Sequence, residues 1–141
     1  MTDDPNAAVR QARVAALEGR YGLRLPEDFR LHLLDPAADQ GWTDNRGIEW
    51  WATHRIRNVP DECGATPEDQ VHPEIEKELD HYLIFADFLC WCYAWAICCS
   101  EGRNRGKVAR VGSGGDLFVA DSFSDFVALA RNDTLAIHVG A

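Results

Sequence analysis

The sequence has no long apolar run. Nowhere in its 141 residues do about 18 uncharged apolar residues follow one another, the length that a helix needs to cross a bilayer. The first twenty residues also hold no apolar run, so we expect no signal peptide. We therefore expect a cytoplasmic protein that has no contact with a membrane.

The cysteine spacing of a secreted disulfide scaffold is absent. The chain has five cysteines, an odd number, which favours reduced thiols. Zinc knuckles place two cysteines two to four residues apart on a turn, twice, and the sequence lacks this spacing. We expect no metal and no cofactor, and we expect the four clustered cysteines to be small buried thiols. The four clustered cysteines are Cys90, Cys92, Cys98 and Cys99.

Familiar catalytic motifs are missing as well. Gly112–Asp116 reads GSGGD, without a G-x-S-x-G elbow or the lysine of a P-loop, and predicts a hairpin turn. Asp87 and Asp121 end predicted strands, where acid/base pairs are common, although Asp121 also suits the start of a helix. A catalytic thiol needs a histidine within hydrogen-bond reach, and the sequence does not place one. A small hydrolase or thiol-dependent enzyme stays open as an alternative.

Negative charge is abundant, and one segment holds much of it. The net charge is −9, whereas five acids balance five bases from Glu101 to Ala141. This local patch disfavours nucleic-acid binding and indicates a basic protein partner, with a solvated surface as the alternative. Its eight acids, against the single base Lys77, are Asp61, Glu62, Glu68, Asp69, Glu74, Glu76, Glu78 and Asp80.

Tryptophan supplies further candidate contact residues, because it is enriched in interface hot spots. Trp50 and Trp51 are neighbours in a predicted strand, Gly47–Thr53, so their side chains would point to opposite faces. Trp42 lies in a polar stretch, and we predict that it contacts the partner together with the acidic segment. Packing in the core is the alternative for each of these tryptophans.

The order of predicted elements indicates one α+β domain, residues 1–141, with no internal repeat or linker. Two helices come first, one opening at Asp4-Pro5 and one at Pro26, and an antiparallel meander follows. Ser122 and Asp125 then form the start of a helix whose apolar residues face the sheet. The expected fold is a mainly antiparallel sheet with N-terminal helices and a C-terminal helix packed on it. The meander strands are expected at 82–86, 90–98, 107–111 and 117–120.

Three blocks resemble the SUKH superfamily, which includes a yeast regulator of cell-wall synthesis and bacterial immunity proteins encoded beside polymorphic toxins. Tyr21–Phe29 resembles the turn and proline that begin the second helix of that family. Tyr82–Asp87 with Tyr93–Ser100 is similar to its paired central strands. Phe118–Phe126 is similar to its closing strand and helix. Together the blocks span roughly Leu17 to Ala130 of the SUKH-like domain.

The resemblance implies a non-enzymatic protein that binds and neutralises a cognate toxin domain. Two departures affect this expectation. Asp35–Gly41 replaces the Asn-Gly turn after the second helix, and Cys90-Trp91-Cys92 stands where the family tends to carry glycine and polar residues. We predict an immunity protein that engages its toxin through the acidic surface. A regulatory interaction module unrelated to toxins is a further alternative.

Overall fold

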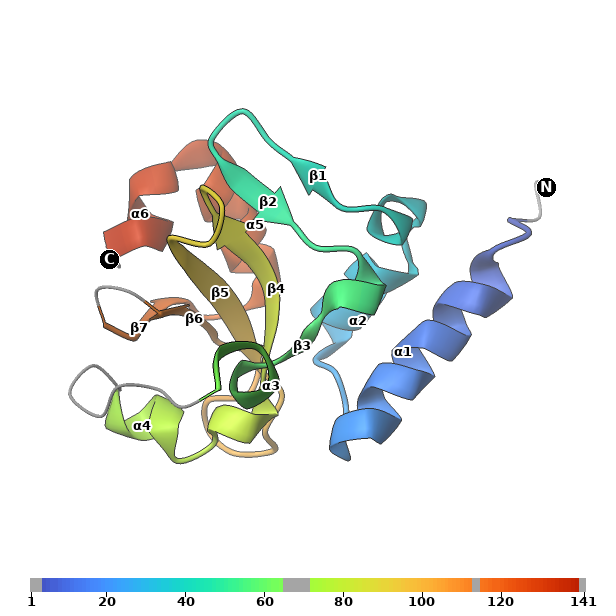
Figure 1. Cartoon of the computed structure of the whole chain (residues 1–141), viewed down its shortest axis with the longest axis horizontal. Helices are drawn as coiled ribbons and strands as arrows, with labels where there is room; N and C mark the ends of the chain where they lie inside the picture. Colours follow the sequence, from blue (N-terminus) through green and yellow to red (C-terminus); the bar gives the residue numbers. More distant parts are fainter. Residues whose placement is uncertain (1–3, 65–71, 113–114, 140–141) are drawn as a thin grey trace.

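The computed structural model describes residues 4–64, 72–112 and 115–139. The chain forms N-terminal helices, an antiparallel meander and C-terminal helices, in that order (Figure 1). This arrangement confirms the predicted α+β class. None of the helices in the described part of the chain has the length and apolarity needed to cross a membrane. The helices are α1 (Ala7–Tyr21), α2 (Glu27–Leu34), α3 (Val59–Cys63), α4 (Pro73–Glu76), α5 (Phe123–Asn132) and α6 (Thr134–Val139). Short 3-10 turns are η1 (Pro36–Asp39), η2 (Thr53–Arg55) and η4 (Leu79–His81).

One antiparallel sheet organises the molecule. Its order is β1-β2-β4-β5-β6-β7, and β3 pairs with β4 beside β2. The two central strands, β4 and β5, carry almost only apolar side chains, and these side chains form the middle of the core. The strands are β1 (Trp42–Thr43), β2 (Ile48–Trp50), β3 (Arg57–Asn58), β4 (Tyr82–Phe88), β5 (Tyr93–Cys98), β6 (Val108–Gly112) and β7 (Leu117–Ala120).

The predicted start of α5 is confirmed. Ser122 caps the helix, and its Oγ accepts a hydrogen bond from the backbone N–H of Asp125 at 3.0 Å. Phe126 is fully buried and packs on Trp95 of β5 at a ring-centroid distance of 5.5 Å. Phe123 is buried as well, whereas Val127 is only half-buried. The apolar side of α5 therefore covers one face of the sheet, as its periodicity predicts.

Trp50 and Trp51 point to opposite faces, and both are buried. Trp50 meets Phe126 of α5 at 5.7 Å between ring centroids. Trp51 is covered on its own face by the guanidinium of Arg55, 4.1 Å from the ring centre. A cation over an indole face stabilises by about 0.5–2 kcal/mol, so this pair helps to hold Trp51 in place.

The strand predicted for residues 90–98 is wrong at its start. Leu89, Cys90 and Trp91 have positive φ angles of 45°, 54° and 71°, so strand β5 begins only at Tyr93. The N–H of Cys92 donates to the carbonyl oxygen of Phe88 at 2.8 Å, which closes one left-handed helical turn. Alternation by size resembles a strand over these residues, but the chain must reverse here to pair β4 with β5. We call residues 88–92 the left-handed turn.

The turn also corrects the expectation of buried thiols. Cys90 and Cys92 are exposed, whereas Cys98 and Cys99, in and after β5, are buried as expected. In a helical turn, side chains two residues apart point to opposite sides, so the two exposed thiols do not face each other. Their replacement should therefore remove little packing.

Candidate functional site

The acidic segment forms one end of the molecule. Helix α3 contacts η4, and the amide Nδ2 of Asn58 donates to the carbonyl oxygen of Asp80 at 3.1 Å. The carboxamide oxygen of Asn58 also caps α3 by accepting from the N–H of Asp61 at 2.9 Å. One side chain thus brings Asp61 and Asp80 together, and α3 and α4 lie at the lower end of the sheet in Figure 1. We call this region the acidic end. Glu68 and Asp69 lie outside the described residues.

Two predicted contact residues are used to hold α3 in place. Asp61 accepts hydrogen bonds from the hydroxyl of Tyr21 at 2.6 Å and from Arg20 at 3.0 Å, which fastens α3 to the end of α1. Glu62 lies 2.9 Å from Nε of Arg57 and accepts from the indole N–H of Trp91 at 2.8 Å. Glu62 therefore connects α3 to the left-handed turn.

Two more members of the segment also have internal partners. Glu74 pairs with Arg103 and accepts from the amide of Asn104 at 2.9 Å. Its side chain is only 31% exposed, so Glu74 offers a partner less of its carboxylate than its place in the acidic segment suggests. Glu78 accepts from the hydroxyl of Ser100 at 2.5 Å. Both residues fasten the acidic end to the hairpin between β5 and β6.

Two acids present their carboxylates to solvent. Glu76 is exposed on α4, and the side chain of Asp80, in the middle of η4, is 71% exposed. The surface available to a partner is therefore smaller than the composition suggests, because arginines from three other segments neutralise Asp61, Glu62 and Glu74. Neither the clustering of these acids nor their neutralisation can be read from residues 61–80 alone.

The remaining predicted contact residue, Trp42, lies at another part of the molecule. Its side chain is 38% exposed and stacks on Trp50, with ring centroids 5.6 Å apart and planes 13° apart. A hollow of about 350 Å³ opens beside these rings between α2, the β1–β2 hairpin and α5. We call it the Trp42 hollow; it is lined by His32, Asp35, Ala37, Trp42, Asp44, Arg46, Trp50, Val127, Ala130 and Arg131. The structure therefore separates Trp42 from the acidic end.

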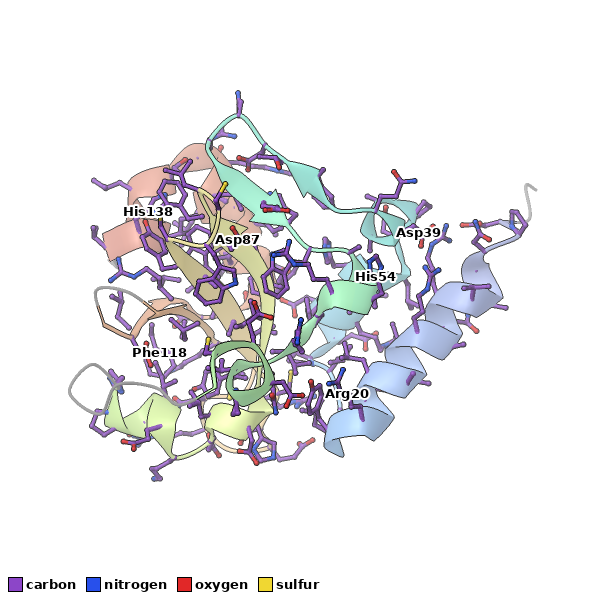
Figure 2. All side chains as sticks on the ribbon, in the orientation of Figure 1. Arg20, Asp39, His54, Asp87, Phe118 and His138 are labelled. Atoms are coloured by element: carbon purple, nitrogen blue, oxygen red, sulfur yellow. The ribbon has the colours of Figure 1, made fainter. Side chains whose placement is uncertain are left out.

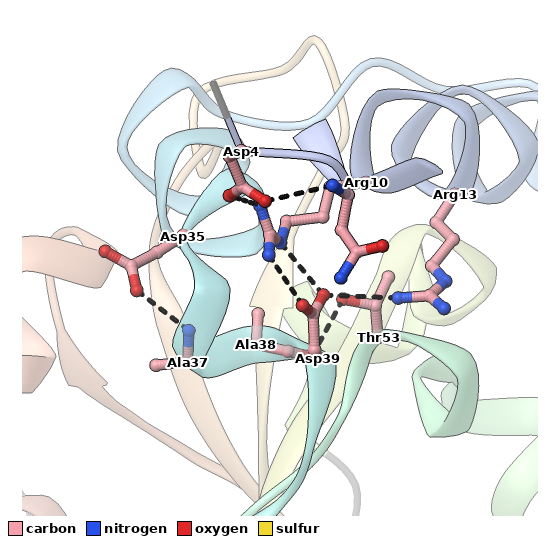
Figure 3. Close-up of polar contacts among 9 residues, drawn as sticks. Asp4, Arg10, Arg13, Asp35, Ala37, Ala38, Asp39 and Thr53 are labelled. Atoms are coloured by element: carbon pink, nitrogen blue, oxygen red, sulfur yellow. Dashed lines mark hydrogen bonds and ion pairs between the residues drawn. The ribbon is translucent and has the colours of Figure 1, made fainter. Parts of the chain in front are cut away.

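One wall of the hollow is held from outside by α1. The guanidinium of Arg10 is 4% exposed, pairs with Asp4, and donates to both carboxylate oxygens of Asp39 at 2.9 and 2.7 Å (Figure 3). Arg10 holds the pKa of Asp39 below its usual range, because the hydrogen bonds favour the charged carboxylate. Asp39 ends η1, whose first turn is capped by Asp35 at 2.9 Å from the N–H of Ala37. The bidentate pair thus positions η1.

The two strand-end carboxylates do not form an acid/base pair. Asp87, labelled in Figure 2, is 1% exposed and accepts from the indole N–H of Trp51 at 2.7 Å and the backbone N–H of Trp91 at 3.0 Å. Asp87 pairs in register with Ala94 at the start of β5. Asp121 instead follows Ala120, which pairs with Val108 at the other end of the sheet. Asp87 holds the left-handed turn in place.

Burial opposes the activation of Cys63 and Cys99. Burial, helped by the nearby charges of Glu62 and Asp116, raises the pKa of Cys63 to about 11. Burial also raises the pKa of Cys99 above its usual range. A nucleophilic cysteine requires the opposite shift, because the thiolate is the reactive form. Among the described residues, no group of three or more histidine, cysteine or acidic side chains is placed to hold a metal ion.

Comparison with known proteins adds no relative. No protein-family model matches the chain, and neither a curated protein nor a solved structure does. The resemblance to the SUKH superfamily therefore stays a prediction from the sequence.

Proposed function

We propose that this chain is a cytoplasmic, non-enzymatic immunity-type protein that binds and neutralises a cognate toxin domain. The acidic end would be its docking surface. The observation that supports the proposal most is the exposure of Glu76 and Asp80, whose carboxylates face solvent beside acids that internal arginines hold in place. A rigid surface that carries net negative charge favours a basic protein partner.

The rigidity of the acidic end follows from its internal bonds. Asn58 joins α3 to η4, and Asp61 joins α3 to α1. Glu74 and Glu78 join the segment to the β5–β6 hairpin. Because these contacts order the surface before it meets a partner, little conformational entropy remains to be lost on binding. Electrostatic attraction would then act mainly on the association rate.

The test uses a toxin domain encoded beside this chain. Co-expression with that domain should protect growth, and the purified pair should associate more slowly as the salt concentration rises. The double variant Glu76→Lys, Asp80→Lys should slow association at low salt by roughly tenfold, with little change in the dissociation rate.

A matched control reverses the charge of two exposed acids at the ends of α5. The double variant Asp121→Lys, Asp133→Lys changes the net charge by the same amount but leaves the acidic end intact. It should slow association much less than the first variant. Equal effects of the two variants would show that association depends on the net charge alone. That result would contradict the acidic end as the docking surface. Absence of any complex with the neighbouring domain would contradict the immunity function itself.

A further inference from the structure

The Trp42 hollow has a chemistry different from that of the acidic end. In Figure 1 the β1–β2 hairpin lies at the upper end of the sheet, away from α3 and α4. Two arginines line the hollow, although the chain as a whole has a net charge of −9. What these arginines contact decides which ligand fits there.

Arg46 and Arg131 have no carboxylate within ion-pair distance in the part of the chain that the structure describes. Arg46 instead donates from Nη2 to the carbonyl oxygen of Arg131 at 2.9 Å, which brings the two residues together at the end of α5. Most other arginines have an acidic partner, namely Arg10, Arg13, Arg20, Arg24, Arg30, Arg55, Arg57, Arg103 and Arg105. Two arginines that line one hollow and have no ion-pair partner among the described residues favour an external anion.

The carboxylates of the hollow are already engaged by other donors. Asp44 accepts from the backbone N–H groups of Arg46 at 2.8 Å and Ile48 at 3.1 Å, and from the indole N–H of Trp50 at 3.2 Å. Asp35 accepts from the N–H of Ala37 at the start of η1. These acids serve as local caps of the hairpin and of η1. These hydrogen bonds use part of the acceptor capacity of both carboxylates, and neither carboxylate forms an ion pair with Arg46 or Arg131.

Three of the residues that line the hollow carry aromatic rings, namely His32, Trp42 and Trp50. Trp42 stacks on Trp50 and leaves part of its ring exposed. The ring of His32 lies 6.2 Å from Trp42 and 6.4 Å from Trp50, between centroids. Burial lowers the pKa of His32 and so favours the neutral imidazole, while the charge of Asp35 opposes this shift. A planar ring can stack here, and a volume of about 350 Å³ is enough for a small ligand.

We propose that the Trp42 hollow binds a small molecule with a planar aromatic ring that carries a carboxylate or phosphate. The ring stacks on Trp42, and the anion lies between the guanidiniums of Arg46 and Arg131. This site is independent of the acidic end, so the proposal stands whether or not the toxin-binding function is correct. The anion of the ligand would accept hydrogen bonds from the two arginines, which have no carboxylate partner among the described residues.

Three probes of one shape test the charge preference. Benzoate, benzamide and benzamidine are, in that order, negative, neutral and positive, and their binding is followed by the indole N–H signals of the protein in NMR spectra. Benzoate should bind with a Kd of about 1 mM, typical of a fragment of this size, and benzamide should bind roughly tenfold more weakly. Benzamidine that binds as tightly as benzoate would overturn the proposal. So would the absence of benzoate binding at about ten times that concentration.

Two further probes separate the ring from the anion. Phenyl phosphate should bind at least as tightly as benzoate, because a phosphate offers more oxygens to two arginines. Inorganic phosphate should bind much more weakly, because it cannot stack on Trp42. Equal affinity for the two phosphates would show that the hollow holds only an anion, which contradicts the aromatic part of the proposal.

Variants then assign the contacts. Arg131→Gln should weaken benzoate binding roughly tenfold and leave benzamide binding unchanged, because only the ion pair is lost. Trp42→Leu should weaken both probes. Arg24→Gln is the matched control, since Arg24 is an exposed arginine outside the hollow. Equal benzoate affinity in the Arg131→Gln and Arg24→Gln variants would overturn the proposal.

The titration of His32 gives a second measurement that does not depend on affinity. Bound benzoate should raise the pKa of His32, because a nearby anion favours the imidazolium form, and benzamide should not. Asp35, Asp44, Arg46 and Arg131 are the charged groups that line the hollow with it, and they are present in both measurements. An unchanged His32 titration in saturating benzoate would place the probe elsewhere.

Discussion

The left-handed turn allows a stability prediction that depends on backbone conformation alone. Cys90 has a φ of 54°, and its side chain is exposed, so its replacement removes little packing. A residue other than glycine in the left-handed helical region costs about 1–2 kcal/mol. Glycine avoids this strain but loses about 0.5–1 kcal/mol through the greater freedom of its unfolded chain. We therefore expect Cys90→Gly to raise the free energy of unfolding by about 0.5–1 kcal/mol.

Cys90→Ala is the control, because alanine removes the sulfur but keeps the Cβ that causes the strain. Urea denaturation of both variants should give equal slopes and a higher midpoint for Cys90→Gly. In a thermal melt, the difference should correspond to roughly 2 °C in a domain of this size. A glycine variant less stable than the alanine variant would refute the assignment of strain to this turn.

Three other perturbations test the parts of the structure that position the two sites. Phe126→Ala should lower the free energy of unfolding by about 3–5 kcal/mol in urea denaturation, because the ring is fully buried, and a stability equal to wild type would contradict the packing of α5. Asp87→Asn should cost about 3–5 kcal/mol, since it removes a buried charge that accepts two N–H donors and lies 3.5 Å from Arg55; a loss below about 1 kcal/mol would contradict this role. The pKa of Asp39 is lowered in the folded state by Arg10, so its stabilising contribution is present above the unfolded value of about 3.9 and is lost as the pH falls below it. Stability measured from pH 6 to pH 3 should therefore fall less steeply in Asp39→Asn than in the wild type.

Local patterns in the sequence determined the order and type of most elements. Ser122, Asp125 and the apolar spacing after them fixed α5, because capping and one-sided periodicity act within a single helix. The apolar run that begins at Tyr82 predicted β4, because a short continuous apolar run is a local signal of a buried strand. From such elements the α+β class and the antiparallel sheet followed. The exposure of Trp42 was proposed from its polar neighbours, and the structure places it at 38%.

The tertiary structure decided what the sequence pattern could not. Cys90 and Cys92 fit a strand by alternation, but the reversal between β4 and β5, held by the carboxylate of Asp87, places them in a left-handed turn. The sequence of residues 61–80 is the same whether its carboxylates are free or paired. Their arginine partners come from α1, β3 and the β5–β6 hairpin, so only the folded chain shows which carboxylates face solvent. The Trp42 hollow likewise needs α2, the β1–β2 hairpin and α5 to meet, because His32 and Arg131 lie far in the sequence from Trp42, Arg46 and Trp50.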